Sequence, residues 1–465
     1  MDVGDNEIMR PVVILVYPKI DFKDNYECTW LPYSVLYIAD ALRSQGLVDV
    51  LVYDANIHQA MSFGDVLRQA ADRLLFVGFS IMTGGSQIAF ALNMAEMVRT
   101  IVPNALRVFG GPHANVLPDE TCRHPLVDMV SVGPGQYVIP KVVQVLLDGG
   151  VLDGVPGVYI KGRDGVSVSG AAVGNEWQAD GLRDWESVDA APYIKTNDVL
   201  LGGRVLNYIA SFGCCYRCRF CYEQYYGQRY HAIPVDKVVR DVSGLIEKYG
   251  LTGMKFYDAD FFVNIDRAER IYRGIHRRHS QTAWAASIHP NDVLRIVARD
   301  KLGLNSVATC GCKRLLMGVE SGNDRVLAET VRKNVTVSQM LKAARLIDNA
   351  GIRGAYTFIL GFPGETREEK KDTIDFAMQL AALPSSPEIR FHGFAPYPGT
   401  LLYSDAIDGG FVPPKSLDGW STFDYYNMKT PWLTPEDECV IREWSKATGR
   451  RLVEKCGKAQ LASKI

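Results

Sequence analysis

Three cysteines in one short stretch have the residue type and spacing to ligate a metal centre. Cys214, Cys218 and Cys221 form a C-x3-C-x2-C pattern. Thiolates favour zinc or iron–sulfur centres over hard cations. A structural zinc normally has a fourth Cys or His at a matching spacing, but His231 lies ten residues past Cys221. Iron–sulfur clusters normally have four thiolates, so three indicate a [4Fe–4S] cluster with one open iron. Structural zinc and plain buried thiols are the alternatives.

This spacing, with the aromatic Phe220 before the last cysteine, resembles the radical S-adenosylmethionine (SAM) enzymes. The resemblance implies that SAM chelates the open iron through its amino and carboxylate groups. It also implies that the reduced cluster cleaves SAM to a 5′-deoxyadenosyl radical, which abstracts a hydrogen atom. Cys215 breaks the spacing and is not expected to be a ligand.

Composition limits the class of protein. A chain of 465 residues predicts two or three domains, and 47% apolar with 22% charged residues is typical of a globular protein. Lys+Arg 51 against Asp+Glu 53, with no basic run, gives no support for a nucleic-acid partner. The sequence contains no apolar run of about 18 residues, so no membrane span is predicted. An acidic, polar N-terminus and ten scattered cysteines predict a cytoplasmic protein without a disulfide framework.

Residues 1–150 alternate apolar strand-like runs with helical patterns. The expected strands are 12–17, 50–54, 75–80, 106–109 and 129–132, and the expected helices are 36–42, 66–74, 88–98 and 140–147. This alternation predicts an α/β fold with a doubly wound, Rossmann-like parallel sheet. Ligands bind beyond the carboxyl ends of such strands, where glycine-containing loops stand at 80–85, 110–113 and 133–136. These glycines could equally serve only as turns, and no G-x-G-x-x-G supports a dinucleotide.

The runs at 77–82, 109–120 and 128–136 resemble the cobalamin-binding domain of cobalamin-dependent radical SAM enzymes. The likeness covers nearly all of residues 10–150 and implies that cobalamin lies over the strand ends. Many members carry Gly-Glu-Gly-Glu where this chain has Gly-Pro-Gly-Gln at 133–136. The implied cobalamin contacts are Ser80, Met82, Thr83, Gly84, Gly110, Gly111, His113, Gly133, Gly135 and Gln136.

The base-off cobalamin motif D-x-H-x-x-G is absent, because Asp54 and His58 have the wrong spacing. We therefore expect no histidine below the cobalt, and we expect His113 to make a packing or amide contact. The segment 21–32, with Trp30 and Leu31, is a hypothesis for a cover over the lower face of the corrin. An apolar lower face would favour methyl transfer from cobalt.

Residues 151–205 read as a linker with a small hairpin at 158–160 and 166–168. Residues 206–400 contain six strand–helix patterns, which predict a partial, TIM-like (β/α)6 radical SAM barrel with its active site at the carboxyl ends of the strands. Residues 401–465 are expected to be a short helical tail that packs on the barrel mouth. There, Trp420, Tyr425, Tyr426 and Trp432 are expected either to line a substrate pocket or to pack against the barrel.

Several motif residues fall at the predicted strand ends. Gly-Val-Glu-Ser-Gly at 318–322 resembles the SAM-binding glutamate motif of the family, although Glu320 could instead be a helix-capping acid. Cys310 and Cys312 are expected to be buried, since an auxiliary cluster would need more cysteines. Asp260 and Arg332 are weaker candidates for contacts with SAM or substrate. The predicted SAM-binding residues are Phe220, Tyr257, Asp258, Ser287, Glu320 and Gly361.

The two resemblances together imply a cobalamin-dependent radical SAM methyltransferase that acts on an unactivated carbon of a small natural-product intermediate. The resemblance also implies an external electron donor of the flavodoxin or ferredoxin type. A rearrangement, ring contraction or cyclisation with the same cofactors is the alternative. A non-catalytic cobalamin or metal carrier is a third hypothesis. No residue names the substrate, and no catalytic side chain is assigned beyond the cluster ligands.

Overall fold

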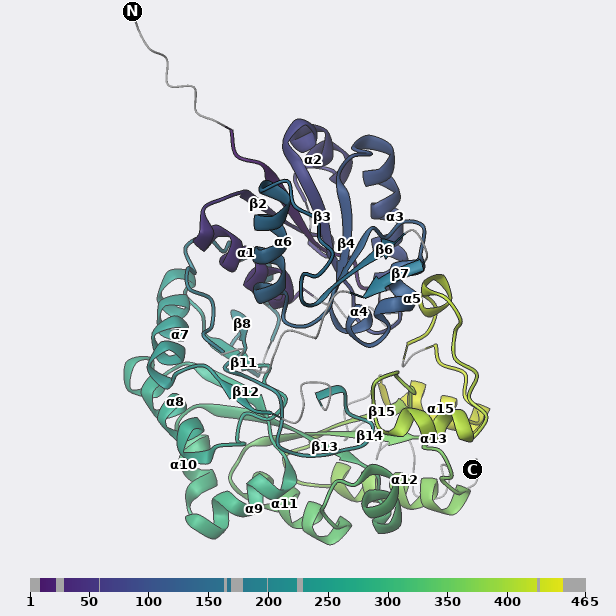
Figure 1. Cartoon of the computed structure of the whole chain (residues 1–465). Coiled ribbons are helices and arrows are strands. Elements are labelled where there is room, and N and C mark those ends of the chain that lie inside the picture. Colours follow the sequence, from purple (N-terminus) through teal and green to yellow (C-terminus); the bar gives the residue numbers. More distant parts are fainter. Residues whose placement is uncertain are drawn as a thin grey trace, which may run out of the picture. The chain divides into compact units, whose positions relative to one another are not determined.

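The chain divides into two compact units, and one of them is assembled from three separate stretches (Figure 1). The computed structural model describes residues 9–21, 29–57, 59–162, 165–168, 179–198, 200–223, 229–424 and 427–445. The first unit comprises Met1–Trp177, Leu182–Tyr193 and Pro414–Asp424, and the second comprises Gln178–Gly181, Ile194–Pro413 and Tyr425–Ile465. The expected linker and tail are therefore each divided between the units. In particular, 414–424 groups with the first unit rather than with the barrel, a correction to our expectation for the tail.

The first unit is built on a seven-stranded sheet in the order β2-β1-β3-β4-β5-β6-β7. The pairs among β1 to β5 are parallel, which confirms the predicted sheet, and the hairpin β6–β7 extends it in the antiparallel sense. The strands are β1 (Val12–Tyr17), β2 (Asp49–Asp54), β3 (Leu74–Ser80), β4 (Leu106–Gly110), β5 (Met129–Ser131), β6 (Val158–Gly162) and β7 (Gly165–Val168).

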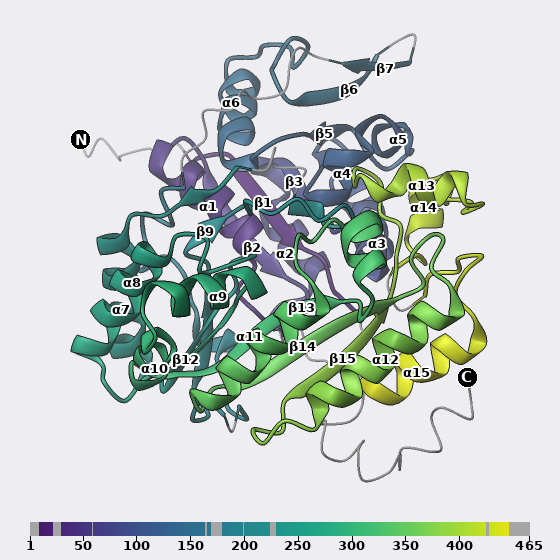
Figure 2. The same ribbon diagram turned by 90° about the horizontal axis from the view of Figure 1, so that it is seen from below.

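Helices cover both faces of this sheet (Figures 1 and 2). On one face, apolar side chains of α1 and α6 pack on β1, β3 and β4 in a single buried cluster that includes Leu42, Val142 and Phe76. The expected helix at 66–74 begins earlier, because the Ser62 hydroxyl accepts from the Asp65 amide, and it ends before Leu74 enters β3. The helical segments are α1 (Tyr33–Gln45), α2 (Phe63–Ala70), η1 (Ala71–Arg73), α3 (Ser86–Ile101), α4 (Pro112–Val116), α5 (Pro118–Arg123), α6 (Gly135–Leu147), η2 (Ala191–Tyr193) and α14 (Leu417–Trp420).

The second unit contains a six-stranded sheet in the order β15-β14-β13-β12-β11-β8, with every pair parallel. This confirms the six predicted strands. A separate two-stranded antiparallel pair, β9 with β10, brackets the cysteine loop. The strands are β8 (Val205–Tyr208), β9 (Ser211–Phe212), β10 (His231–Ala232), β11 (Gly253–Phe256), β12 (Ala283–Ser287), β13 (Cys312–Glu320), β14 (Arg353–Leu360) and β15 (Glu388–Gly393).

Helices form an outer layer along these six strands (Figures 1 and 2). Between strand and helix layers, Trp284 packs on Tyr272 with ring centroids 5.7 Å apart. The helices α9 and α10, which precede β13, were not predicted. The helical segments are α7 (Val235–Tyr249), α8 (Ile265–Arg278), α9 (Pro290–Arg299), α10 (Gly303–Thr309), the π-helical turn η4 (Val326–Val331), α11 (Val337–Asn349), α12 (Arg367–Ala381), α13 (Leu402–Asp408) and α15 (Pro435–Ser445).

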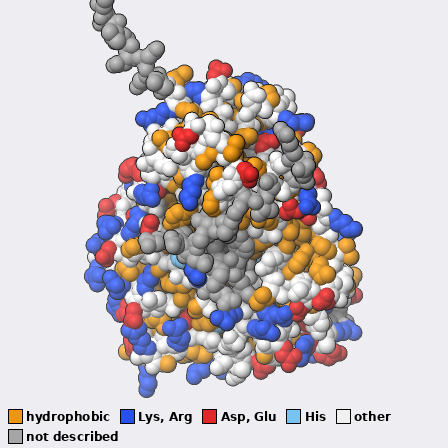
Figure 3. All heavy atoms as spheres, in the orientation of Figure 1, with side chains coloured by type: hydrophobic (Ala, Val, Ile, Leu, Met, Phe, Trp, Pro, Cys, Tyr) orange, Lys and Arg blue, Asp and Glu red, His pale blue; other side chains and the backbone are white. Residues whose placement is uncertain are grey.

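On the face drawn in Figure 3, basic and acidic side chains are interspersed rather than gathered into one basic stripe. Among the described residues, no helix combines the length and the apolar character that a membrane crossing requires.

One buried arginine ties both ends of the β9–β10 pair to α8. The Arg267 guanidinium is 7% exposed and donates to the carbonyls of Ala210 at 2.6 Å and Ile233 at 2.8 Å. Ala210 directly precedes β9 and Ile233 directly follows β10. Arg267 therefore fixes the base of the loop that carries the three cysteines.

We expect Arg267→Met to lower the free energy of unfolding by about 2–4 kcal/mol, because two buried carbonyls lose a charged donor. Arg270→Met is the matched control, since Arg270 lies on the same helix and is exposed; we expect it to change stability by no more than about 0.5 kcal/mol. Urea titration of the apoprotein measures both. Equal effects of the two substitutions would contradict the anchoring role of Arg267.

Candidate active site

The cysteine loop leaves β9 through a sharp turn and returns beside its own starting point. Gly213 has a φ of 77°, and a Cβ there would lie 1.8 Å from the Arg229 carbonyl oxygen. Only glycine permits this close approach. Further along, the Arg219 amide donates to the Val331 carbonyl at 2.9 Å, and the Arg219 side chain pairs with Asp405 at 2.7 Å. The loop is therefore held against η4 and α13.

The three candidate ligands differ in exposure but share an apolar setting. Cys218 is buried, Cys214 and Cys221 are partly buried, and Cys215 is exposed. The Cys221 amide donates to the Cys218 carbonyl at 3.0 Å, which closes a turn between these two ligands. Burial raises the pKa of all three thiols, to about 12 for Cys221. Nearby cationic iron would stabilise the thiolates that this environment otherwise disfavours.

No three His, Cys, Asp or Glu side chains of the described residues converge closely enough to hold a single metal ion. A [4Fe–4S] cube offers a separate iron atom to each thiolate, so its ligands are spaced more widely than those of one ion. Cys214, Cys218 and Cys221 all lie on the one loop between β9 and β10.

Asp258 acts on the cysteine loop from the end of β11. Its two carboxylate oxygens accept from the Ala210 amide at 3.1 Å and from the Ser211 hydroxyl. Burial raises the Asp258 pKa to about 6, while these hydrogen bonds and Arg267 oppose the rise. The geometry shows Asp258 supporting β9. Of the other residues predicted in this part of the site, Tyr257 is 41% exposed, and the Ser287 carbonyl accepts from the Phe261 amide at 3.2 Å.

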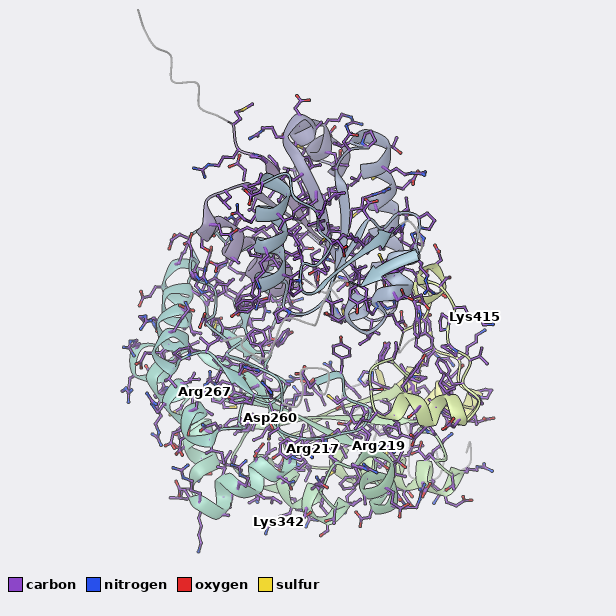
Figure 4. All side chains as sticks on the ribbon, in the orientation of Figure 1. Arg217, Arg219, Asp260, Arg267, Lys342 and Lys415 are labelled. Atoms are coloured by element: carbon purple, nitrogen blue, oxygen red, sulfur yellow. The ribbon has the colours of Figure 1, made fainter. Side chains whose placement is uncertain are left out.

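Asp260, labelled in Figure 4 together with Arg217 and Arg219 of the cysteine loop, belongs to a second buried group. One of its oxygens accepts from the Phe262 amide at 2.9 Å. Burial and the nearby Asp292 carboxyl raise the Asp260 pKa well above its usual range. Asp292 in turn pairs with Arg295 at 2.5 Å. On the loop itself, Tyr216 stacks on His289 at a ring distance of 3.5 Å. The sequence analysis missed this contact, and no spacing signal indicated it.

Glu320 lies at the end of β13 and is paired with a lysine that the sequence analysis also missed. The Lys333 ammonium donates to the Glu320 carboxylate at 3.2 Å, and both side chains are buried. Burial raises the Glu320 pKa, and Lys333 opposes that rise. A Cβ on Gly318 would lie 2.1 Å from the Glu320 carboxylate, so the first glycine of the motif makes room for it. The hydrogen bond of the Glu320 carboxylate is to the Lys333 ammonium rather than to the backbone at the start of a helix.

The loop after β14 contains Gly361 and lies near Phe220, two residues predicted to bind SAM. The Glu365 carboxylate accepts from the amides of Gly361 at 2.7 Å and Phe362 at 3.1 Å, and burial raises the Glu365 pKa to about 7. The ring of Phe220 lies 6.1 Å from that of Phe362. Phe220 and Gly361 are therefore neighbours in the second unit, as a shared SAM-binding role requires.

The remaining residues named in the sequence analysis of the second domain and the tail lie in the following places. Cys312 is 1% exposed, and the Cys310 carbonyl accepts from the Trp284 ring at 2.8 Å, so both cysteines are buried as expected. Arg332 follows η4 with a left-handed φ of 55°. Trp432 packs beside Gly361, while Trp420 belongs to the first unit. Tyr425 and Tyr426 lie outside the described residues, and so do His58 and residues 22–28 of the proposed corrin cover.

One hollow of about 710 Å³ lies beside the start of α8 and the end of α9. None of the residues predicted to bind SAM lines it. Its lining residues are Tyr230, Val263, Asn264, Ile265, Asp266, Arg295, Ala298 and Arg299.

In the first unit, polar atoms without partners gather at the ends of three neighbouring strands. Among the described residues, the hydroxyls of Thr83 and Ser131 and both ring nitrogens of His113 are buried without a hydrogen-bond partner. They follow or end β3, β5 and β4, respectively. Buried polar groups normally have partners. The amide arms and nucleotide tail of cobalamin carry matching donors and acceptors, so this edge fits that cofactor.

The remaining predicted cobalamin contacts surround these atoms or shape the loops. Ser80 donates to Ser34 at 2.9 Å, Met82 is 43% exposed, and the Gly133 amide donates to Asn115 at 2.6 Å. A Cβ at position 111 would lie 2.7 Å from the Ile81 carbonyl oxygen, and one at position 135 would lie 2.6 Å from the Ile38 side chain, so both positions need glycine. Leu31 is buried, Trp30 and Gln136 are partly buried, and Gly110 ends β4 next to Ser131. Gln87, which the sequence analysis missed, links the Met82 amide to the Pro18 carbonyl.

The two units thus define an α/β protein with a ligand-binding Rossmann-like sheet and a cysteine loop at the strand ends of a second parallel sheet. Residues 208–377 match the Radical SAM superfamily, and residues 22–143 match the B12 binding domain. The chain belongs to the cobalamin-dependent radical SAM enzymes, whose cofactors are a [4Fe–4S] cluster, SAM and cobalamin.

Curated relatives cover most of the chain. An uncharacterized methyltransferase of Pyrococcus horikoshii is 27% identical over 92% of this chain and 90% of its own. Cytidylyl-2-hydroxyethylphosphonate methyltransferase of Streptomyces wedmorensis is 23% identical over 94% and 89%. Anaerobic magnesium-protoporphyrin IX monomethyl ester cyclase of Cereibacter sphaeroides is 26% identical over 88% of this chain but 64% of its own. The two relatives above that match over about nine-tenths of their own length are methyltransferases, and they support the same type of enzyme here.

Solved structures share the fold. The radical SAM methyltransferase TsrM from Kitasatospora setae, with cobalamin and a [4Fe–4S] cluster bound, superposes with a TM-score of 0.69 at 19% identity, covering 86% of this chain and 78% of its own. The cobalamin-dependent radical enzyme OxsB gives a TM-score of 0.63 at 19% identity over 79% and 52%. These likenesses confirm the predicted two-part α/β architecture.

The environment of His113 gives a testable pH dependence. Burial lowers the His113 pKa from 6.5 to about 4. The unfolded chain then binds a proton more readily than the folded one, so the stability contribution is complete above about pH 6.5 and is lost as the pH falls towards 4. Between pH 7 and pH 4, the wild type should lose about 3 kcal/mol more unfolding free energy than His113→Phe. Urea titrations across this range measure the difference. Parallel pH profiles of the two proteins would contradict an unpartnered, neutral His113.

Proposed function

We propose that this enzyme transfers a methyl group to a carbon atom of a small natural-product intermediate. The observation that carries the proposal is the near full-length match to methyltransferase relatives, whereas the cyclase relative extends well beyond the matched region. A small substrate is supported by TsrM, which was solved with its tryptophan substrate and a SAM analogue. We also propose a cytoplasmic location and an external electron donor of the flavodoxin or ferredoxin type.

Cys214, Cys218 and Cys221 are the proposed cluster ligands. When bound, the cluster supplies the electron that cleaves SAM to a 5′-deoxyadenosyl radical, and cobalamin supplies the methyl group. The protein holds the reacting groups in position. Asp258 and Arg267 fix the base of the cysteine loop, and Arg219 fixes its far side through Val331 and Asp405.

SAM is proposed to bind along the strand ends of the second unit, at Phe220, Tyr257, Asp258, Ser287, Glu320 and Gly361. Its amino acid part carries an ammonium and a carboxylate. Glu320 offers the matching negative charge, and Lys333 balances that charge by an ion pair at 3.2 Å. A buried carboxylate without a partner is costly, so Lys333 keeps Glu320 in place for the ligand.

Cobalamin is proposed to bind at the strand ends of the first unit, where Thr83, His113 and Ser131 present unpartnered polar atoms. The glycines of the surrounding loops let the backbone approach the cofactor. The remaining proposed contacts are Trp30, Leu31, Ser80, Met82, Gly84, Gly110, Gly111, Gly133, Gly135 and Gln136.

Glu320→Gln keeps the size of the side chain and removes its charge. We expect SAM to bind at least about 10-fold more weakly to this variant, because a charged partner is lost. Equilibrium dialysis of the cluster-reconstituted protein with labelled SAM measures the dissociation constant. Glu329→Gln is the matched control, since Glu329 is a largely exposed acid on η4. Unchanged SAM affinity of Glu320→Gln would refute the assignment.

The reaction itself is tested by anaerobic turnover with candidate metabolites, reductant and SAM that carries a deuterated methyl group. We expect a product heavier by one labelled methyl group, together with 5′-deoxyadenosine. Replacing Cys214, Cys218 or Cys221 by Ala should abolish both products and lower the iron content, whereas Cys215→Ala should retain them because Cys215 is outside the motif. Full turnover by a variant of any motif cysteine would overturn the cluster assignment.

Cyclisation or rearrangement with the same cofactors is the second candidate. It is favoured by the magnesium-protoporphyrin cyclase relatives, which are 26% and 23% identical to this chain. Product mass separates the two reactions, because only methylation adds the labelled methyl group.

A further inference from the structure

A segment from the C-terminal part of the chain completes the first unit. Residues Pro414–Asp424, here called the strap, group with the first unit although the catalytic-domain sequence precedes them. The strap contains α14, which lies beside α3 (Figure 2). Its exposed start is marked by Lys415 in Figure 4, whereas Leu417 and Trp420 are each 1% exposed.

The backbone of the strap touches the loop after β3. The Gly85 amide donates to the Trp420 carbonyl at 2.9 Å. A Cβ on Gly84 would lie 2.1 Å from the Phe423 carbonyl oxygen, and one on Gly85 would lie 3.3 Å from the Asp424 carboxylate. Both glycines also have left-handed φ values of 78° and 86°. The strap therefore requires glycine at position 84, whereas position 85 favours glycine through its own left-handed backbone.

The side chains of the strap reach the segment after β4. The Trp420 ring meets the His113 ring edge to face, with centroids 5.8 Å apart. His113 is 0% exposed. Directly after α5, the His124 ring lies 3.2 Å from the Asp418 carboxylate. The strap thus contacts the two neighbouring strand ends that present Thr83 and His113.

We propose that the strap is part of the cobalamin site, and that Trp420 is a positioning residue. By holding the β3 loop at Gly84–Gly85 and the β4 loop at His113, Trp420 keeps their unpartnered polar atoms in the geometry that receives the cofactor. This inference rests on the cobalamin-binding loops proposed above and is independent of whether the enzyme methylates or cyclises its substrate.

The first test compares hydroxocobalamin binding to Trp420→Ala, Trp420→Phe and wild type, read by corrin absorbance after gel filtration. We expect Trp420→Ala to bind at least about 10-fold more weakly, because the ring contact and its packing are lost. Trp420→Phe keeps a ring and should stay within about 3-fold of wild type. Lys415→Ala is the matched control in the exposed part of the strap and should bind as wild type does. Iron content after reconstitution should be equal in all four proteins.

Wild-type affinity of Trp420→Ala would overturn the proposal. If that variant loses iron as well as cobalamin, or fails to fold, hydrogen exchange of the unmodified protein decides. Adding hydroxocobalamin should slow exchange of the amides at 84–85 and 414–424 together. Slowing at 84–85 without any change at 414–424 would overturn the role of the strap. Absent methyl transfer in the turnover assay would leave these binding results unaffected, so the two proposals fail separately.

Discussion

The cysteine loop depends on one residue, Ala210, whose backbone is held between two buried opposite charges. The Ala210 amide donates to Asp258 and the Ala210 carbonyl accepts from Arg267. Because Ala210 directly precedes β9, this arrangement fixes the point from which the loop departs. Both charges are buried and partly satisfied by the same backbone. The loop can therefore carry three thiols in an apolar setting without relying on the metal centre alone for its position.

A second constraint acts at the end of β13, where the backbone is strained. Glu320, Arg332 and Asn334 have left-handed φ values of 67°, 55° and 56°. Such conformations are unfavourable for side chains with a Cβ and persist where the surroundings determine them. Here the surroundings are the Glu320–Lys333 ion pair and the π-helical turn Val326–Val331, a type of helix frequent at functional sites. The strain aims a buried carboxylate at the strand ends instead of letting it turn to solvent.

Much of the fold followed from local patterns. Apolar runs located the five parallel strands of the first sheet and the six of the second, because buried strands leave continuous apolar stretches. The cysteine spacing located the loop for the same local reason. The residues that the sequence analysis missed act across long separations. Lys333 sits in a polar stretch without periodicity, and Tyr216 meets His289 only through the barrel fold.

Glycines show most clearly where sequence reasoning reaches its limit. Gly84 was predicted to contact cobalamin, but a Cβ on it would meet the carbonyl of Phe423, more than three hundred positions later, and one on Gly85 would meet Asp424. Nothing in the local sequence identifies that neighbour, because a missing Cβ leaves room for a cofactor and for protein backbone alike.

The divided layout of the first unit has a consequence for how this enzyme is made. Its sheet emerges from the ribosome early, yet the contacts of Gly84, Gly85 and His113 remain open until Asp424 has been synthesised. The nascent chain must therefore carry a complete N-terminal sheet whose contacts with residues 414–424 are still missing throughout synthesis of the barrel. An excised fragment that ends before residue 414 would retain that sheet but lack the contacts that Trp420, Phe423 and Asp424 make with it.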